Sequence, residues 1–164
     1  MTQDEIQPLP WSALVCEPDQ DAIAEIGNAW AWRLKGPFRP VLFTALGDMF
    51  FARDTGDIWW LNTGTADLTR VASSVEEFNQ LIGTSIADEW FLPLLIEQLR
   101  LVGKLLEPGE CYSYVILPIF SEGRYEPDNL NPVAAREHFS LTGGMHKDLQ
   151  IHPDGTRVKL TVVK

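Results

Sequence analysis

Residues 46–62, which read LGDMFFARDTGDIWWLN, decide the fold of this chain. The middle of the stretch, Asp54-Thr55-Gly56, is a short loop motif that ends in glycine, the residue that most readily adopts the left-handed conformation such loops need. The runs on either side, MFFA and IWWL, are apolar at consecutive positions, so both faces of each strand are expected to be covered. The stretch therefore predicts a β-hairpin in the middle of a sheet, with helices or loops packed over it.

The register of this hairpin follows from its turn. If Arg53 pairs with Asp57, counting outward along both strands gives three opposed pairs: Phe51 with Trp59, Phe50 with Trp60, and Met49 with Leu61. Aromatic cross-strand pairs stabilise a sheet and resist a slip of one residue, which would turn every side chain to the other face.

The periodicity of apolar residues predicts the remaining elements. Helices are expected over 19–34, over 75–82 with a capping box at Ser74 and a C-terminal cap at Gly83, and over 86–102 with a kink or fresh start at Pro93. Strands are expected over 41–46, 68–72 and 112–117.

After a polar loop over 121–131, Asn131-Pro132 predicts the start of a helix that runs toward Leu149 and is interrupted or ended by Gly143-Gly144. The alternation of Val158, Leu160 and Val162 predicts an edge strand. This order predicts an α+β fold, in which residues 1–164 form a single domain with a mainly antiparallel sheet flanked by helices and residues 1–18 form an N-terminal arm.

The chain of 164 residues has a net charge of −10 from 23 acidic and 13 basic residues. This charge argues against direct nucleic-acid binding, which needs a basic patch, and is compatible with attraction to a basic protein partner. No apolar run approaches the ~20 residues needed to cross a membrane. Because residues 1–10 are polar and acidic rather than a signal peptide, and the two cysteines suggest no disulfide framework, we expect a cytoplasmic protein.

The sequence contains no phosphate-binding glycine loop, no nucleophile elbow and no histidine pair with zinc spacing, so we expect no cofactor, no metal and no catalytic residue. The histidines are interpreted as structural or surface residues, with His138 as polar surface beside Phe139. Cys111 begins an apolar strand, where a thiol is usually inert packing. Two alternatives stay open: a small hydrolase that uses Cys111 or a histidine, and a small-ligand-binding regulatory domain with an aromatic pocket lined by Trp59, Trp60 or Trp90.

The long acidic loop over 121–131 is the best candidate for a recognition surface, because loops on a rigid sheet often carry function. We expect its polar and aromatic side chains to contact a partner, namely Glu122, Arg124, Tyr125, Glu126 and Asp128. Asp88 and Glu89 form a second acidic patch on the helix over 86–102.

Several of these features resemble a known bacterial family. They are Gly47-Asp48 before an aromatic strand, Trp59-Trp60, Val75-Glu76-Glu77-Phe78, Glu89-Trp90, Gly103, the run Pro108-Gly109-Glu110-Cys111-Tyr112, Pro118, and Asn129-Leu130. Over roughly residues 40–150 the chain is similar to the C-terminal domain of type VI secretion immunity proteins, often found beside a GAD-like region. The hairpin alone also resembles the SMI1/KNR4-like (SUKH) immunity proteins. The chain departs from the family pattern at Ser121-Glu122-Gly123, where a Gly-Gly pair is expected.

The resemblance implies an antitoxin that binds and neutralises a cognate type VI secreted toxin, in several cases a DNase, by stoichiometric protein–protein interaction. Such an inhibitor needs no catalysis. An acidic surface suits this role, since nuclease toxins are commonly basic and complementary fields accelerate association.

Overall fold

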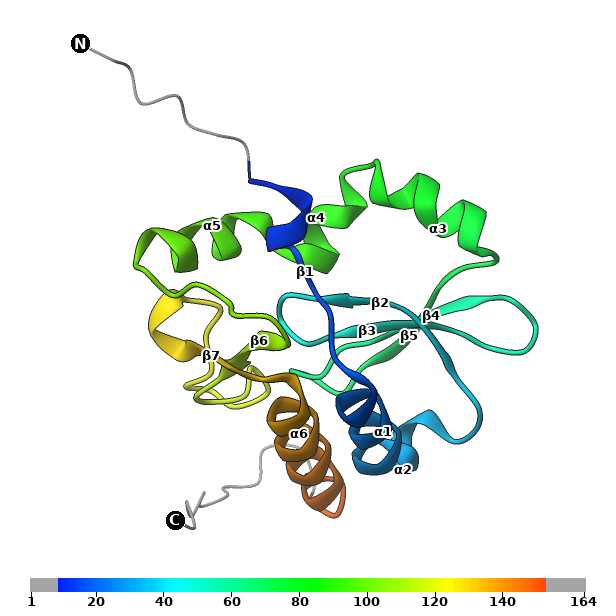
Figure 1. Cartoon of the computed structure of the whole chain (residues 1–164). Helices are drawn as coiled ribbons and strands as arrows, with labels where there is room; N and C mark the ends of the chain where they lie inside the picture. The colour runs from blue at the N-terminus through cyan, green and yellow to red at the C-terminus, as the bar shows by residue number, and fades with distance from the viewer. Residues whose placement is uncertain (1–8, 153–164) are drawn as a thin grey trace.

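The structure, a computed structural model, describes residues 9–152 (Figure 1). An antiparallel sheet has the strand order β1-β2-β3-β4-β5, and a second sheet pairs β6 with β7. The strands are β1 (Val15–Cys16), β2 (Arg39–Thr44), β3 (Met49–Ala52), β4 (Ile58–Leu61), β5 (Leu68–Ala72), β6 (Glu110–Tyr114) and β7 (Leu130–Ala134). The helices are η1 (Trp11–Ala13), α1 (Gln20–Ala29), α2 (Ala31–Leu34), α3 (Val75–Ile82), α4 (Ile86–Phe91), α5 (Pro93–Leu101), η2 (Pro127–Asn129) and α6 (Ala135–Leu149). The predicted α+β class is confirmed, and the strand predicted around Val158, Leu160 and Val162 lies outside the described residues.

The predicted hairpin is formed by β3 and β4, and its register is confirmed at every position. The paired residues are Met49 with Leu61, Phe50 with Trp60, and Phe51 with Trp59, and the amide of Arg53 donates to the carbonyl of Asp57 at 3.0 Å. Gly56 has a φ of +88°, the left-handed conformation that the turn requires. Both strands lie inside the sheet, between β2 and β5.

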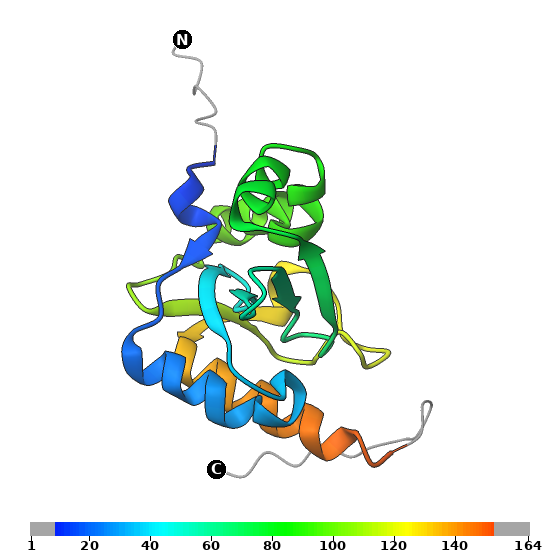
Figure 2. The ribbon, with the colours of Figure 1, turned by 90° about the vertical axis from the view of Figure 1, so that its right-hand side faces the viewer.

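Helices cover both faces of this sheet, which explains why the hairpin is apolar on both sides. In Figures 1 and 2, α3, α4 and α5 lie on one side of the strands and α1, α2 and α6 on the other. Met49 and Phe51 belong to the cluster that contains residues of α1 and α6, whereas Phe50 and Ile58 pack with Phe78 and other residues of α3 and α4. Successive residues of these strands thus place their side chains in two separate cores, one on each face of the sheet.

Most predicted boundaries agree with the structure to within a few residues. The helix predicted over 19–34 is divided at Trp30 into α1 and α2, and the Asp19 side chain caps α1 by accepting from the amide of Ala22 at 2.9 Å. The helix predicted over 86–102 is divided at Pro93, which starts α5. The strands predicted over 41–46 and 112–117 run over 39–44 and 110–114.

The prediction that Asn131-Pro132 starts a helix is wrong, because both residues lie in β7. Pro132 is opposite Tyr112, whose amide points away from β7 and donates to the carbonyl of Ala45 at 2.7 Å. This pair therefore exchanges no ladder hydrogen bond, and the missing amide hydrogen of proline costs nothing. The helix begins at Ala135 instead.

The prediction that Gly143-Gly144 interrupts or ends the last helix is also wrong, since α6 runs unbroken from Ala135 to Leu149. α6 packs along α1, and Gly143 lies at their closest approach. A Cβ atom at Gly143 would lie 2.6 Å from the carbonyl oxygen of Ala29, and the indole of Trp32 donates to the carbonyl of Gly143 at 3.2 Å. Glycine is present here because the two helix backbones leave no space for a side chain.

Candidate partner interface

The loop predicted to contact a partner is on the surface. Glu122, Arg124, Tyr125, Glu126 and Asp128 are all exposed. Tyr125 keeps 44% of its area accessible, while its ring packs edge-on against that of Tyr114 in β6, with the centroids 6.0 Å apart. The aromatic side chain is thus held by the domain and still presents a large face to solvent, which suits an interface anchor.

The loop is held in one conformation by the side chain of Asn129. Its Oδ1 accepts from the amide of Ile116 at 2.9 Å, and its Nδ2 donates to the carbonyls of Ile116 and Arg124, both at 2.8 Å. Gly123 fits against Leu117 so closely that a Cβ atom would lie 2.1 Å from the Leu117 carbonyl oxygen. A loop fixed in this way loses little conformational entropy when it binds.

A hollow of about 460 Å³ lies between this loop and the end of α5, and it is lined by Val102, Lys104, Glu126, Pro127 and Asp128. The ammonium group of Lys104 closes the gap between the two segments by donating to the carbonyls of Pro127 at 2.7 Å and Leu130 at 2.9 Å. Glu126 and Asp128 are exposed and contribute acidic side chains to the lining of the hollow.

Sequence reasoning missed the apolar residues beside this hollow. Leu101, Val102 and Leu105 keep 79%, 61% and 57% of their areas exposed. The helix predicted over 86–102 includes Val102, but α5 ends at Leu101 and Gly103 turns the chain with a φ of +84°. A compact group of exposed apolar side chains with an acidic rim is typical of a protein interaction site.

Asp88 and Glu89 are exposed on α4, as predicted, but the structure does not bring them to the loop. α4 lies in the helical layer above the five-stranded sheet, and the loop lies beside β6 and β7 (Figure 1). The two acidic groups are separate patches, so one small partner surface would not contact both.

A chain of buried hydrogen bonds connects β6 to the hairpin. The Oγ of Ser113 lies 2.7 Å from Nδ1 of His138, and Nε2 of His138 lies 2.8 Å from Oγ1 of Thr63. The carboxylate of Asp48 accepts from the hydroxyl and amide of Thr63, at 3.1 and 3.0 Å, and from the indole of Trp60 at 3.1 Å. If Ser113 donates to His138, His138 to Thr63 and Thr63 to Asp48, each donor has an acceptor.

The ionisable groups in this hydrogen-bond chain, Asp48 and His138, are buried. Desolvation raises the pKa of Asp48 to about 7, and desolvation followed by the nearby His146 lowers the pKa of His138 to about 3. His138 is completely buried, so the prediction that it is polar surface is wrong. Cys111 is equally buried, and desolvation raises the pKa of its thiol well above the usual value. These groups hold α6 and β6 against the hairpin.

The burial of His138 and His146 corresponds to a pattern that is present in the sequence. Ala135, His138, Thr142 and His146 recur at intervals of three and four and are all buried, so they form the inner face of one continuous helix. The pattern is visible only if the helix is read through Gly143.

Trp60 and Trp90 pack in the layer between the sheet and α4, with ring centroids 5.8 and 5.0 Å from that of Phe50. Within residues 9–152, no group of three or more His, Cys, Asp or Glu side chains is placed to hold a metal ion. None of the helices in this part of the chain is both long and apolar enough to cross a membrane.

Comparison with known proteins gives one informative match. Residues 72–146 match the model of a family described as T6SS immunity protein Tdi1, C-terminal. The matched stretch runs from the end of β5 into α6 and includes all seven predicted contact residues, whereas the hairpin lies before it. The comparison with curated proteins gives no match.

Proposed function

We propose that this protein is an antitoxin that binds a cognate secreted toxin in the cytoplasm and neutralises it stoichiometrically, because residues 72–146 match the model of the T6SS immunity protein Tdi1 C-terminal family. The family match carries the proposal.

We further propose that the toxin is a nuclease with a basic surface, such as a DNase. The chain has a net charge of −10, and five of the seven predicted contact residues are carboxylates. A nuclease carries positive charge that attracts the phosphates of its substrate. The same positive charge attracts an acidic inhibitor. Complementary charge raises the association rate, while buried anchors slow dissociation.

The anchors on this surface are the exposed apolar group at the end of α5 and the half-exposed ring of Tyr125. Glu126 and Asp128 line the hollow between the loop and the end of α5. An apolar centre with a charged rim is the usual arrangement of a stable protein interface. The fixed loop supplies this surface without a rearrangement.

Charge reversal in the loop tests the proposal. The double variant Glu122→Lys/Glu126→Lys is expected to weaken binding to the toxin encoded beside this protein by at least about tenfold at low salt, and to reduce the dependence of affinity on salt. The matched control is Glu76→Lys, an exposed residue on α3. Binding is measured by calorimetry in low and high salt. Affinity equal to that of the unsubstituted protein in both conditions would remove the loop from the interface.

A survival assay tests the same proposal in cells. Cells that produce the toxin are expected to survive only with this protein present. If a mutant without it grows normally when attacked by sibling cells, the protein is not an antitoxin.

A further inference from the structure

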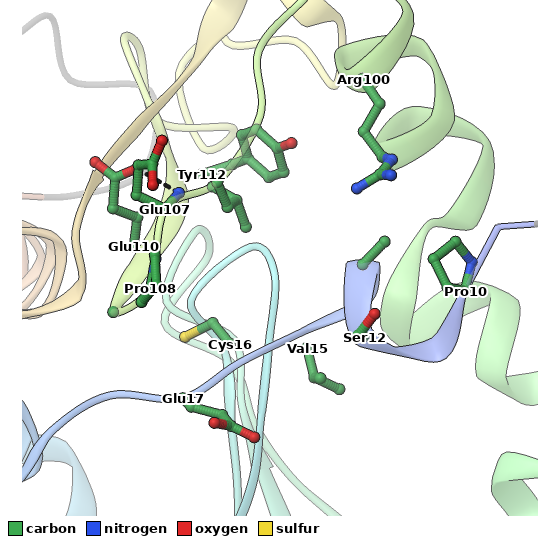
Figure 3. Close-up of a pocket in the computed structure, with 13 residues that line it drawn as sticks. Pro10, Ser12, Val15, Cys16, Glu17, Arg100, Glu107, Pro108, Glu110 and Tyr112 are labelled. Atoms are coloured by element: carbon green, nitrogen blue, oxygen red, sulfur yellow. Dashed lines mark hydrogen bonds between the residues drawn. The ribbon is translucent and has the colours of Figure 1, made fainter.

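A cleft of about 480 Å³ lies between β1 and β6 (Figure 3). Val15, Cys16 and Glu17 line one side, and residues 106–110 with Tyr112 line the other. Arg100 of α5 and Ser12 lie at one end. Its volume falls in the range of about 300–1,000 Å³ that is usual for ligand sites.

One wall of the cleft is the unpaired edge of the five-stranded sheet. β1 is the terminal strand of that sheet and pairs only with β2. The amide of Ala45 donates to the carbonyl of Leu14 at 2.9 Å, whereas the amide of Thr44 donates to the carbonyl of Asp48, on the side of β3. Because hydrogen-bonded and non-bonded pairs alternate, the pair of Val15 with Thr44 is non-bonded. The amide and carbonyl of Val15 therefore point away from β2, toward the cleft.

The opposite wall is the edge of the smaller sheet. The amide of Tyr112 donates to the carbonyl of Ala45 at 2.7 Å, so the backbone groups of Tyr112, and by alternation those of Glu110, point away from β7. The amide of Glu110 donates to the carbonyl of Glu107 at 3.0 Å. Ala45 thus bonds to Leu14 and to Tyr112. β1 and β6 diverge from Ala45, and the cleft is the space between the edge of the five-stranded sheet at β1 and the edge of the smaller sheet at β6.

The charged lining of the cleft is mainly acidic. It contains three glutamates, Glu17, Glu107 and Glu110, and one arginine, Arg100, so the lining carries two more negative than positive charges. Glu110 is partly engaged, because its carboxylate accepts from the amide of Glu107 at 2.8 Å. The carboxylates of Glu17 and Glu107 are exposed. Figure 3 shows the glutamates apart from Arg100, so cationic groups are favoured at the end of the cleft that the glutamates occupy.

We propose that this cleft binds an extended, lysine- or arginine-bearing segment of the toxin, which pairs with the outer edge of β1 and places its cationic side chains at Glu17 and Glu107. Strand addition supplies main-chain hydrogen bonds, and the two carboxylates select the charge of the added segment. This inference rests on the proposed function for the identity of the partner, but its chemistry is testable without the toxin.

The probe is a blocked heptapeptide of alternating lysine and valine, titrated into the whole protein and followed by the backbone amide signals of Val15 and Glu17 in NMR. We expect saturable shifts with a dissociation constant below about 1 mM, and at least a tenfold weaker affinity, a loss of about 1.4 kcal/mol, for Glu17→Lys/Glu107→Lys. The same peptide N-methylated at its valines loses binding if main-chain pairing holds it. An alternating glutamate–valine peptide is expected not to bind.

Three results would overturn the inference: no shift at millimolar peptide, equal binding of the acidic and basic peptides, or dimerisation of the free protein through the Val15 edge. Measurements of toxin binding then distinguish a failure of this inference from a failure of the proposed function. If the unsubstituted protein binds the toxin and Glu17→Lys/Glu107→Lys binds it equally well, the cleft is not a contact and the antitoxin function stands. If the unsubstituted protein does not bind the toxin, the proposed function fails, while the peptide titration still reports on the cleft.

Discussion

Gly143 and Gly144 form a matched pair of sites that tests the packing of α6 on α1. In Gly143→Ala, the new Cβ atom would lie 2.6 Å from the carbonyl oxygen of Ala29 and 2.8 Å from its carbonyl carbon and its Cβ atom. These are atoms fixed to the backbone of α1, so the clash is relieved only by moving one helix away from the other. Overpacking of this kind costs about 1–3 kcal/mol, and the better helix propensity of alanine returns up to about 1 kcal/mol.

The net expectation for Gly143→Ala is a loss of up to about 2 kcal/mol in the free energy of unfolding, which corresponds to a fall of roughly 4–8 °C in Tm for a chain of this size. Gly144 is exposed, and no atom lies within 4 Å of a Cβ placed there. Gly144→Ala therefore adds only the better helix propensity of alanine, and it is expected to raise Tm by about 2–4 °C. Urea unfolding and thermal melts monitored by circular dichroism compare the two. If both substitutions stabilise the protein equally, the close contact between the helices is refuted.

Two further predictions concern the loop and the buried hydrogen-bond chain. Asn129→Ala removes three side-chain hydrogen bonds, so we expect a loss of about 2–3 kcal/mol in stability and weaker toxin binding; unchanged values in urea unfolding and calorimetry would contradict this. The raised pKa of Asp48 destabilises the fold as pH increases from about 4 to about 7, whereas the lowered pKa of His138 stabilises it from about 3 to about 6.5. The stability of the protein relative to Asp48→Asn is therefore expected to fall as pH rises from 4 to 7, by up to about 1.4 kcal/mol per pH unit, and a constant difference in urea unfolding would show that Asp48 is not perturbed.

The centre of the fold was predictable from sequence because local signals agree there. Turn chemistry at Gly56, apolar runs on both sides and a single plausible pairing at Arg53 fixed the register of the hairpin, and the structure confirms it. The cap at Ser74 and the restart at Pro93 were predictable for the same reason, since each depends on residues adjacent in sequence.

The errors occur where long-range contacts override local preference. Pro132 resembles a helix start until its partner strand is known, and Gly143 resembles a helix end until α1 is seen against it. His138 resembles surface because its hydrogen-bond partners, Ser113 and Thr63, are 25 and 75 residues away in sequence. At the candidate interface the acidic loop was predictable from composition, but the exposed apolar group at Leu101 was not. Its exposure depends on where α5 ends.

The hydrogen-bond chain from Ser113 through His138 to Thr63 has a consequence for how such proteins evolve. The matched stretch over 72–146 supplies Ser113 and His138. The segment around the hairpin, residues 47–63, supplies Thr63, Asp48 and the space at Gly47, where a Cβ atom would lie 2.4 Å from the imidazole of His138. Recombination at the start of the matched stretch would join an imidazole to a hairpin that did not evolve to receive it. Chimeric antitoxins with new toxin specificity are therefore expected to inherit both halves together, or to change through substitutions in their exposed loops.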